Sequence, residues 1–237
     1  MKIRIPADPP SSAAASALLT RDARLCRSMR DELRKEFEWR GLLCLHLIGA
    51  PGSGKTRVIE RTLGELPTGT RAAVLLGGLA TDDDLGRLSR TGAAVKAIAA
   101  DGESDLDAAA VARSLRLRRV DALDLLFIEN AGDVTALADL DLGQQATVIV
   151  SGVSEGDDKP EKYASAYRRA ALSLVTKTDL LPYVEFDPAR LRTATRRAHP
   201  GMPQILVSCR TGEGFPEWHD WLTAHRALAR TRQVETA

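Results

Sequence analysis

The sequence has few aromatic residues, few cysteines and no long apolar run. Phe, Trp and Tyr make up 4% of its 237 residues, and no segment approaches the roughly 18 apolar residues of a membrane-spanning helix. The cysteines Cys26, Cys44 and Cys209 form no C-x-x-C pair, which favours a reducing compartment. No basic flank precedes an apolar stretch at the N-terminus, so we expect no secretion signal and a cytoplasmic protein. The net charge of +1 gives no support for binding to nucleic acid or membrane.

Apolar segments that alternate with helical patterns make up most of the chain. This order predicts an α/β fold of three layers, with a mostly parallel central sheet and helices on both faces. We expect residues 1–19 to be disordered and residues 20–237 to form one domain, with an N-terminal helix that Gly41 ends. Strands are expected near 42–48, 72–77, 94–99, 123–129, 146–151, 171–176 and 204–208. Helices are expected near 20–40, 55–65, 82–91, 105–117, 160–169, 188–198 and 215–228.

Residues 49–56 read GAPGSGKT and match the P-loop pattern G-x-x-x-x-G-K-[ST]. An apolar strand precedes them and a helical pattern follows, which is the context that a phosphate-binding loop requires. In such a loop the backbone N–H groups cradle phosphates, the lysine reaches the β and γ phosphates, and the hydroxyl binds Mg²⁺. The alternative is a chance Gly-rich turn. The expected nucleotide contacts are Gly49, Pro51, Gly52, Ser53, Gly54, Lys55, Thr56 and Arg57.

An apolar strand near 123–129 ends in an acid, and a glycine follows three residues later. Glu129 in this position can support Mg²⁺, and the N–H of Gly132 can contact the γ-phosphate. Taken alone, the pattern also fits an ordinary strand end with a polar turn. Beside a P-loop it favours a Mg²⁺ and γ-phosphate sensor, so we expect Lys55, Thr56, Glu129 and Gly132 to form the catalytic set.

The segment Thr176-Lys177-Thr178-Asp179 resembles the guanine-specificity motif N-K-x-D. An aspartate accepts hydrogen bonds from N1–H and N2–H₂ of guanine, a donor pattern that adenine lacks. Lys177 would lay its aliphatic stem on the base. Threonine replaces the usual asparagine, which removes a bridging amide. Ser208 and Cys209, after the last strand, would back the base. The order of these segments favours GTP over ATP.

The chain resembles HypB, the family of GTPases that help to insert nickel into NiFe hydrogenases. The resemblance runs from about residue 25 to residue 228 and rests on the P-loop, on LDLLFIENAGD at 123–133, and on VSEGDDKP at 153–160 followed by Lys162-Tyr163. It implies a Rossmann-like P-loop NTPase domain of the SIMIBI class. It also implies slow hydrolysis of GTP with Mg²⁺, a homodimer that forms when GTP binds, and a hydrogenase maturation partner or the hydrogenase large subunit as partner.

The switch region and the metal site depart from the family at three places. An aspartate that the family has in switch I is Gly78 here, and glycine has no side chain to orient water or bind metal. Thr81, Asp82 or Asp84 is expected to cap the helix that follows. The family's Cys-His pair reads Ser104-Asp105, and a second family cysteine falls at Ala136. Hydroxyl and carboxylate groups suit Ni²⁺ and Zn²⁺ poorly, so no residue is confidently assigned to either metal.

The remaining histidines do not repair this metal site. We expect His46, within the first strand, to be a hydrogen-bonded core residue, and His219 and His225 lack the spacing for one ion. The expected function is therefore a HypB-like maturation GTPase. Two alternatives remain: a nucleotide-gated scaffold or regulator that has lost metal handling, and an accessory GTPase for another nickel enzyme such as urease.

Overall fold

One parallel sheet contains all the strands of the described chain. The computed structural model describes residues 12–78, 81–98, 106–116 and 123–236. The strand order across the sheet is β3-β2-β4-β1-β5-β6-β7, and every neighbouring pair is parallel. The predicted α/β fold is therefore confirmed. The strands are β1 Leu43–Gly49, β2 Ala72–Gly78, β3 Ala94–Ala97, β4 Leu125–Ala131, β5 Ala146–Gly152, β6 Leu172–Thr176 and β7 Gln204–Leu206.

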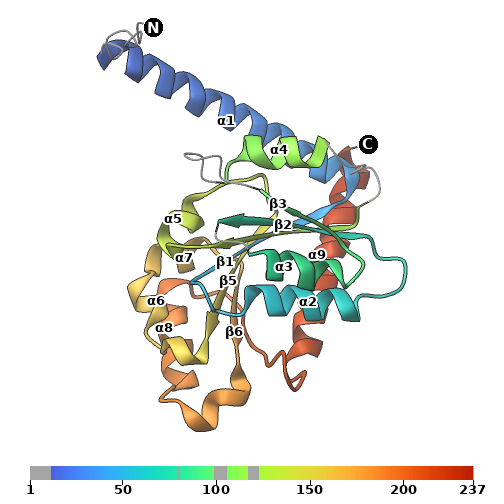
Figure 1. The fold of residues 1–237 in the computed structure, drawn as a ribbon. Coiled ribbons are helices and arrows are strands. Elements are labelled where there is room, and N and C mark those ends of the chain that lie inside the picture. Colours follow the sequence, from blue (N-terminus) through green and yellow to red (C-terminus); the bar gives the residue numbers. More distant parts are fainter. Residues whose placement is uncertain (1–11, 79–80, 99–105, 117–122, 237) are drawn as a thin grey trace, which may run out of the picture.

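Helices cover both faces of the sheet and complete the three predicted layers (Figure 1). Within the described residues, no helix combines the length and the apolar character needed to cross a membrane. The α-helices are α1 Ser12–Arg40, α2 Lys55–Glu65, α3 Asp82–Ser89, α4 Ala108–Arg116, α5 Val134–Asp139, α6 Lys159–Lys162, α7 Ala164–Arg169, α8 Pro188–Ala198 and α9 Phe215–Thr236. Two short 3₁₀ helices are η2 Val153–Glu155 and η3 Thr178–Tyr183.

The central strand β1 is buried along its whole length. Leu43, Leu45 and Leu47 point to one face and pack in a cluster with α2 and α9. Cys44 packs on the other face with α1 and α4, and Ile48 packs there with α5 and α7. This alternation follows from the two-residue period of a strand, and burial on both faces explains the continuous apolar run in the sequence. Full burial of each leucine side chain contributes about 1.5–3 kcal/mol.

His46 is also buried within β1. It is fully enclosed, and among the described residues neither ring nitrogen has a hydrogen-bond partner. Burial lowers its pKa to about 4, so the ring is neutral at pH 7. The predicted core position is confirmed, whereas the expected hydrogen bond is wrong.

Helix α1 packs against the domain through its C-terminal half. Leu33 and Phe37 are buried beside α4, and Gly41 ends the helix with a φ of +60°. The N-terminal half extends away from the sheet (Figure 1). The helix begins at Ser12, so the expectation of disorder is wrong for residues 12–19, while residues 1–11 lie outside the described residues. An alanine-rich run at 13–15 has high helix propensity, which explains the earlier start.

Two further elements differ from the sequence-based expectation. Helix α5 was not predicted, because six residues are too few to show a helical period. The helix expected at 160–169 is two short helices, α6 and α7, which meet at Tyr163. Neither difference changes the order of the strands.

Candidate nucleotide-binding site

The P-loop forms the turn between β1 and α2. Gly49 is the last residue of β1, and α2 begins at Lys55. Gly52 and Gly54 have φ values of +78° and +95°, which residues with a side chain rarely adopt. A Cβ on Gly49 would lie 2.2 Å from the carbonyl oxygen of Val150. Backbone geometry therefore requires these glycines, and the predicted strand, loop and helix are all present.

Lys55 lies folded over the loop that precedes it. Its Nζ donates to the carbonyl oxygens of Gly49 at 3.0 Å and Ala50 at 2.9 Å, and to Ser53 Oγ at 3.2 Å. Burial lowers the pKa of Lys55, and the negative charge of Glu129 opposes that shift. A buried ammonium group held at the mouth of the loop is suited to bind anionic phosphate oxygens.

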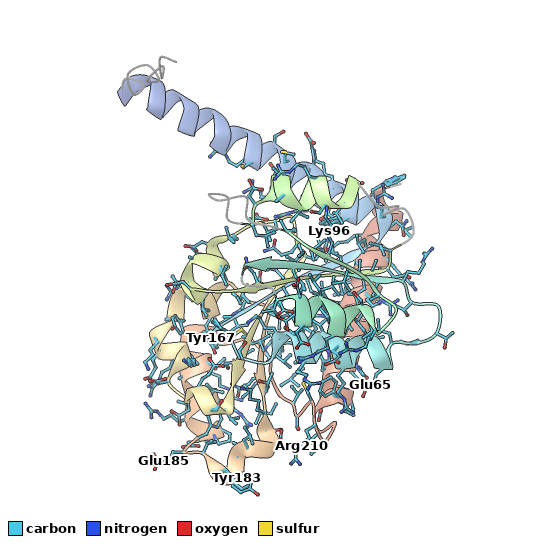
Figure 2. All side chains as sticks on the ribbon, viewed as in Figure 1. Glu65, Lys96, Tyr167, Tyr183, Glu185 and Arg210 are labelled. Carbon is cyan, nitrogen blue, oxygen red and sulfur yellow. The ribbon has the colours of Figure 1, made fainter. Side chains whose placement is uncertain are left out.

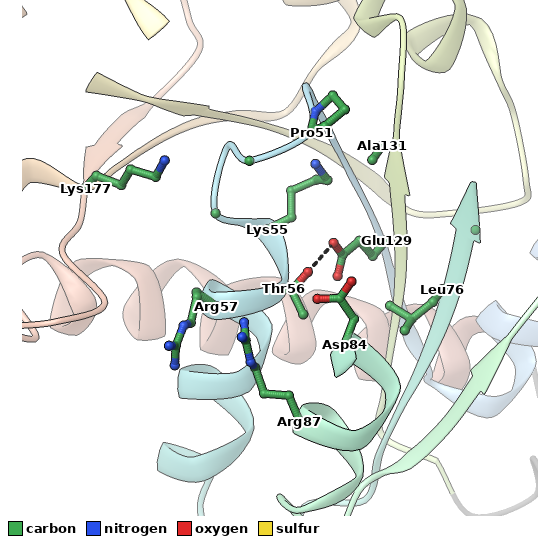
Figure 3. Close-up of a pocket in the computed structure, with 13 residues that line it drawn as sticks. Pro51, Lys55, Thr56, Arg57, Leu76, Asp84, Arg87, Glu129, Ala131 and Lys177 are labelled. Atoms are coloured by element: carbon green, nitrogen blue, oxygen red, sulfur yellow. Dashed lines mark hydrogen bonds between the residues drawn. The ribbon is translucent and has the colours of Figure 1, made fainter. Parts of the chain in front are cut away.

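Thr56 and Glu129 come from different elements and meet beside the loop. Thr56 Oγ1 donates to Glu129 Oε1 at 2.6 Å (Figure 3). Burial raises the pKa of Glu129, and the Thr56 hydrogen bond opposes this effect. Its Oε2 is buried and has no partner among the described residues. A hydroxyl beside a carboxylate with an unused oxygen fits a small oxygen-seeking cation such as Mg²⁺.

Asp84 and Arg87, both on α3, line the same cavity as Thr56 and Glu129 (Figure 3). Its volume is about 310 Å³, at the lower end of the range for small-ligand pockets. Asp84 also caps α3: its Oδ2 accepts from Thr81 Oγ1 at 2.7 Å, and its N–H donates back to the Thr81 hydroxyl. The expected cap at Thr81 and Asp84 is thus confirmed.

Arg87 was not singled out in the sequence. Arg87 lies one helical turn after Asp84, so both side chains lie on the same face of α3. That spacing is the sequence signal that could have identified Arg87 as a residue lining the cavity. Its guanidinium is held by Asp83 at 3.3 Å and lies 3.9 Å from Glu60 on α2. Arg87 therefore links the helix after β2 to the helix after the P-loop.

Gly78, at the position of the missing switch aspartate, ends β2 with a φ of +71°. A Cβ built there would lie 3.0 Å from both the carbonyl oxygen of Ala131 and the side-chain oxygen of Asn130. The backbone path at this point suits glycine, so the departure from the family pattern is accompanied by a local geometry that disfavours a side chain.

Asp179, expected to read the base, lies in η3 directly after β6. Its Oδ1 accepts from Ser208 Oγ at 2.6 Å and its Oδ2 accepts from Arg210 Nε at 2.9 Å. These bonds lower the pKa of Asp179, with the Ser208 hydroxyl as the largest cause, so the group is an anion at neutral pH. Lys177, two residues earlier, has a φ of +62°, unusual for a residue with a side chain.

Thr176 joins β6 to the P-loop. Thr176 Oγ1 donates to the carbonyl oxygen of Ser53 at 2.5 Å. A Cβ built on Gly54 would lie 3.0 Å from Thr176 Oγ1. The sequence suggested that replacement of the usual asparagine removes the bridging amide between the two segments. The structure shows that the two segments are still bridged. A shorter hydroxyl bridge takes its place.

The cavity brings together only part of the predicted set. The predicted residues that line it are Pro51, Gly52, Gly54, Lys55, Thr56, Arg57, Glu129 and Lys177. Those that do not line it are Gly49, Ser53, Gly132, Asp179, Ser208 and Cys209. The N–H of Gly132 donates to Gly49 O at 3.4 Å. Burial raises the pKa of the Cys209 thiol to about 11, so it is protonated at neutral pH.

The family's transition-metal positions are only partly described. Ser104 and Asp105 lie outside the described residues. Ala136 lies in the first turn of α5, where its N–H donates to Asp133 Oδ1 at 3.1 Å. In the part of the chain that the structure describes, no three His, Cys, Asp or Glu side chains are grouped to hold a metal ion.

Comparisons with known proteins agree with this geometry. Residues 43–205 match the family model described as CobW/HypB/UreG, nucleotide-binding domain. The hydrogenase maturation factor HypB of Azotobacter vinelandii is 40% identical over 206 residues, which are 86% of this chain and 67% of the relative.

Two solved structures also share the fold. The hydrogenase maturation factor HypB of Archaeoglobus fulgidus superimposes with a TM-score of 0.79 at 31% identity, over 86% of this chain and 99% of that one. HypB of Helicobacter pylori, solved in complex with nickel, gives a TM-score of 0.78 at 23% identity, over 85% and 95%. With a P-loop, a Thr56–Glu129 contact and these relatives, the chain belongs to the HypB group of the CobW/HypB/UreG family of nucleotide-binding proteins.

Proposed function

We propose that the chain binds GTP with Mg²⁺, hydrolyses it slowly, and assists nickel insertion into a NiFe hydrogenase. One observation carries the nucleotide part: the Thr56 hydroxyl, the Glu129 carboxylate and the Lys55 ammonium converge on one phosphate loop. The A. vinelandii relative is a hydrogenase maturation factor, which supports the biological role.

The P-loop residues would bind and polarise the triphosphate. Water attacks the γ-phosphorus, the bond to the β–γ bridging oxygen breaks, and GDP and inorganic phosphate leave. Lys55 and the loop N–H groups stabilise the negative charge that grows on the bridging oxygen. Thr56, Glu129 and Asp84 would hold Mg²⁺, which supplies charge neutralisation at the phosphates. The unpartnered Oε2 of Glu129 supports this assignment.

Turnover is expected to be slow because the switch region offers little help to the attacking water. Gly78 has no side chain that can orient a water molecule. The carboxylate of Asp84 is engaged by Thr81 at the start of α3. Catalysis then rests on positioning and on electrostatic stabilisation by Lys55.

Guanine selectivity is assigned to Asp179. The carboxylate is anionic and its position is held by two protein donors, so it can accept both N1–H and N2–H₂ of guanine. Adenine lacks this pair of donors and would leave the base-facing acceptor sites of Asp179 unused. Ser208 and Cys209 would lie behind the base, and the stem of Lys177 would lie on its face.

Partners and metal follow from family membership. We expect a homodimer that forms with GTP and docks a hydrogenase maturation partner or the large subunit of the hydrogenase. The H. pylori structure, in complex with nickel, supports nickel as the transported metal. A second candidate is a nucleotide-gated scaffold without metal handling, and Ala136 favours it because a methyl group cannot bind Ni²⁺ or Zn²⁺.

Calorimetric titration with nucleotides tests the proposal. With Mg²⁺ present, GDP should bind at least about 100-fold more tightly than ADP, because adenine lacks the N1–H and N2–H donors that guanine offers to the Asp179 carboxylate. Lys55→Ala should weaken GDP binding by at least about tenfold, because a charge-assisted bond is lost. Lys35→Ala, an exposed lysine on α1, serves as the matched control. Equal affinity for ADP, or unchanged binding in the Lys55 variant, contradicts the proposal.

Two further measurements separate the candidates. Phosphate release from GTP reports hydrolysis, and sizing with GDP or a non-hydrolysable GTP analogue, each with and without Ni²⁺, reports dimerisation. Tight stoichiometric nickel together with a GTP-dependent dimer supports the maturation GTPase. A GTP-dependent dimer that is indifferent to Ni²⁺ and Zn²⁺ supports the scaffold.

A further inference from the structure

We propose that Arg210 is a positioning residue for base recognition: together with Ser208 it holds the Asp179 carboxylate so that one acceptor site on each oxygen remains for guanine. The inference rests on the proposed guanine-binding role of Asp179.

The two protein donors divide the carboxylate between them. Ser208 Oγ donates to Oδ1 at 2.6 Å, and Arg210 Nε donates to Oδ2 at 2.9 Å. Both donors come from the segment directly after β7, whereas Asp179 follows β6, the neighbouring strand. The segment after β7 therefore donates to both carboxylate oxygens of Asp179, which lies in the segment after β6.

The number of acceptor sites matches the requirement of the base. An ionised carboxylate offers about four acceptor sites, two on each oxygen. Ser208 and Arg210 each take one, on different oxygens, so these two side chains saturate neither oxygen. Guanine presents N1–H and one N2–H side by side, a pair of donors that needs one acceptor on each oxygen. If both protein donors used the same oxygen, this match would be lost.

The loop that carries the two donors is itself held in place. The backbone N–H groups of Arg210 and Thr211 both donate to Ser208 Oγ at 3.2 Å, which directs the hydroxyl proton toward Asp179. The carbonyl oxygen of Cys209 accepts from Arg61 on α2 at 3.0 Å. The base-reading pair is therefore tied to the helix that begins at the P-loop.

Arg210 acts on orientation more than on fold stability. Its side chain is 74% exposed, whereas that of Asp179 is 12% exposed. Figure 2 shows Arg210 at the surface of the molecule. An ion pair with so exposed an arginine contributes little to folding. A substitution at Arg210 is thus expected to leave the fold intact and to change how well the carboxylate is aimed.

Binding of GDP, IDP and ADP to the wild-type protein, Arg210→Ala and Arg210→Lys tests the inference. IDP lacks the N2 amino group and makes one bond to Asp179 where GDP makes two. We expect Arg210→Ala to weaken GDP binding about fivefold to tenfold, the value of one hydrogen bond, and IDP binding about twofold at most. The GDP-to-IDP affinity ratio therefore falls, and Arg210→Lys restores part of it.

The matched control is Arg230→Ala, which removes an ion pair of similar exposure, with Asp124, from α9. An unchanged GDP-to-IDP affinity ratio in Arg210→Ala overturns the inference. If both affinities fall equally, the substitution has a general effect on charge or on the loop; if neither affinity changes, Arg210 has no effect on base recognition. If the alanine variant fails to fold by circular dichroism, Arg210→Gln is measured with the same expectation.

The design separates this inference from the function on which it rests. If the wild-type protein does not prefer GDP over ADP, or if Asp179→Asn binds GDP as the wild type does, the guanine-binding role is wrong and the inference falls with it. If that preference is present and only the Arg210 variants leave the GDP-to-IDP ratio unaltered, the guanine-binding role stands and the inference alone is refuted.

Discussion

Glu129→Gln should make the nucleotide-free protein more stable while it impairs Mg²⁺-dependent nucleotide binding. Glu129 is 8% exposed, and burial raises the pKa of its carboxyl group. A raised pKa in the fold means that the charged form costs free energy at neutral pH. Glutamine has nearly the same shape, keeps an oxygen acceptor for Thr56, and carries no charge. The change therefore removes a destabilising charge and a proposed metal ligand together.

The expected gain in the free energy of unfolding is on the order of 1 kcal/mol at pH 7. Replacing a buried charge by a neutral group commonly stabilises the folded state by such amounts. The loss of the attraction between Lys55 and Glu129 offsets part of the gain. For a chain of 237 residues this corresponds to a rise in Tm of about 2–4 °C. The pKa of Glu129 in the fold lies above its ordinary value of 4.5. The wild-type protein therefore has this part of its stability below pH 4.5 and loses it as the pH rises through the pKa of the folded state. The variant should not.

Thermal unfolding without nucleotide, followed by GDP titration with and without Mg²⁺, measures both effects. We expect Mg²⁺ to increase GDP affinity in the wild-type protein, and Glu129→Gln to reduce that increase about tenfold or more, a loss typical of altered metal sites. Glu65→Gln, at an exposed glutamate paired with Arg61 on α2, is the control. A destabilised variant, or one whose Mg²⁺ response matches the wild type, would refute the reasoning.

Three further changes test other parts of the structure. The pKa of His46 in the fold is about 4 against an ordinary 6.5, so stability should fall by up to about 3 kcal/mol between pH 6.5 and 4, and His46→Leu should remove most of that fall in pH-dependent urea unfolding. Thr176→Val removes the hydroxyl bond to Ser53 and should cost about 1–2 kcal/mol and weaken GDP binding, whereas Thr176→Ser should keep both; equal behaviour of the two variants counts against the bridge. Gly78→Asp places a Cβ 3.0 Å from Ala131 O at positive φ and should cost about 1–2 kcal/mol in thermal unfolding without faster phosphate release, so a stable and faster variant would contradict the geometry.

The sequence predicted the strands and their alternation with helices because each is a local pattern. Residues 42–48 are apolar except for His46, which fits burial on both faces of a parallel sheet. GAPGSGKT was interpretable for the same reason, since the glycines, the lysine and the threonine act within one turn. Short elements such as α5 were missed because six residues give no period, and α1 was predicted too short because its first residues lie in a Pro-, Ala- and Ser-rich stretch.

Residue types alone predicted a phosphate-binding loop and membership in the HypB group, which the comparisons show. Contacts between distant segments needed the tertiary structure. The 2.6 Å bond from Thr56 to Glu129 joins residues on α2 and β4, and the hold of Arg210 on Asp179 joins the segments after two neighbouring strands. The sheet sets both, because parallel strands bring their carboxyl ends, and the loops that follow them, to one edge. Only that arrangement brings the phosphate loop after β1 and the acid of β4 into one cavity.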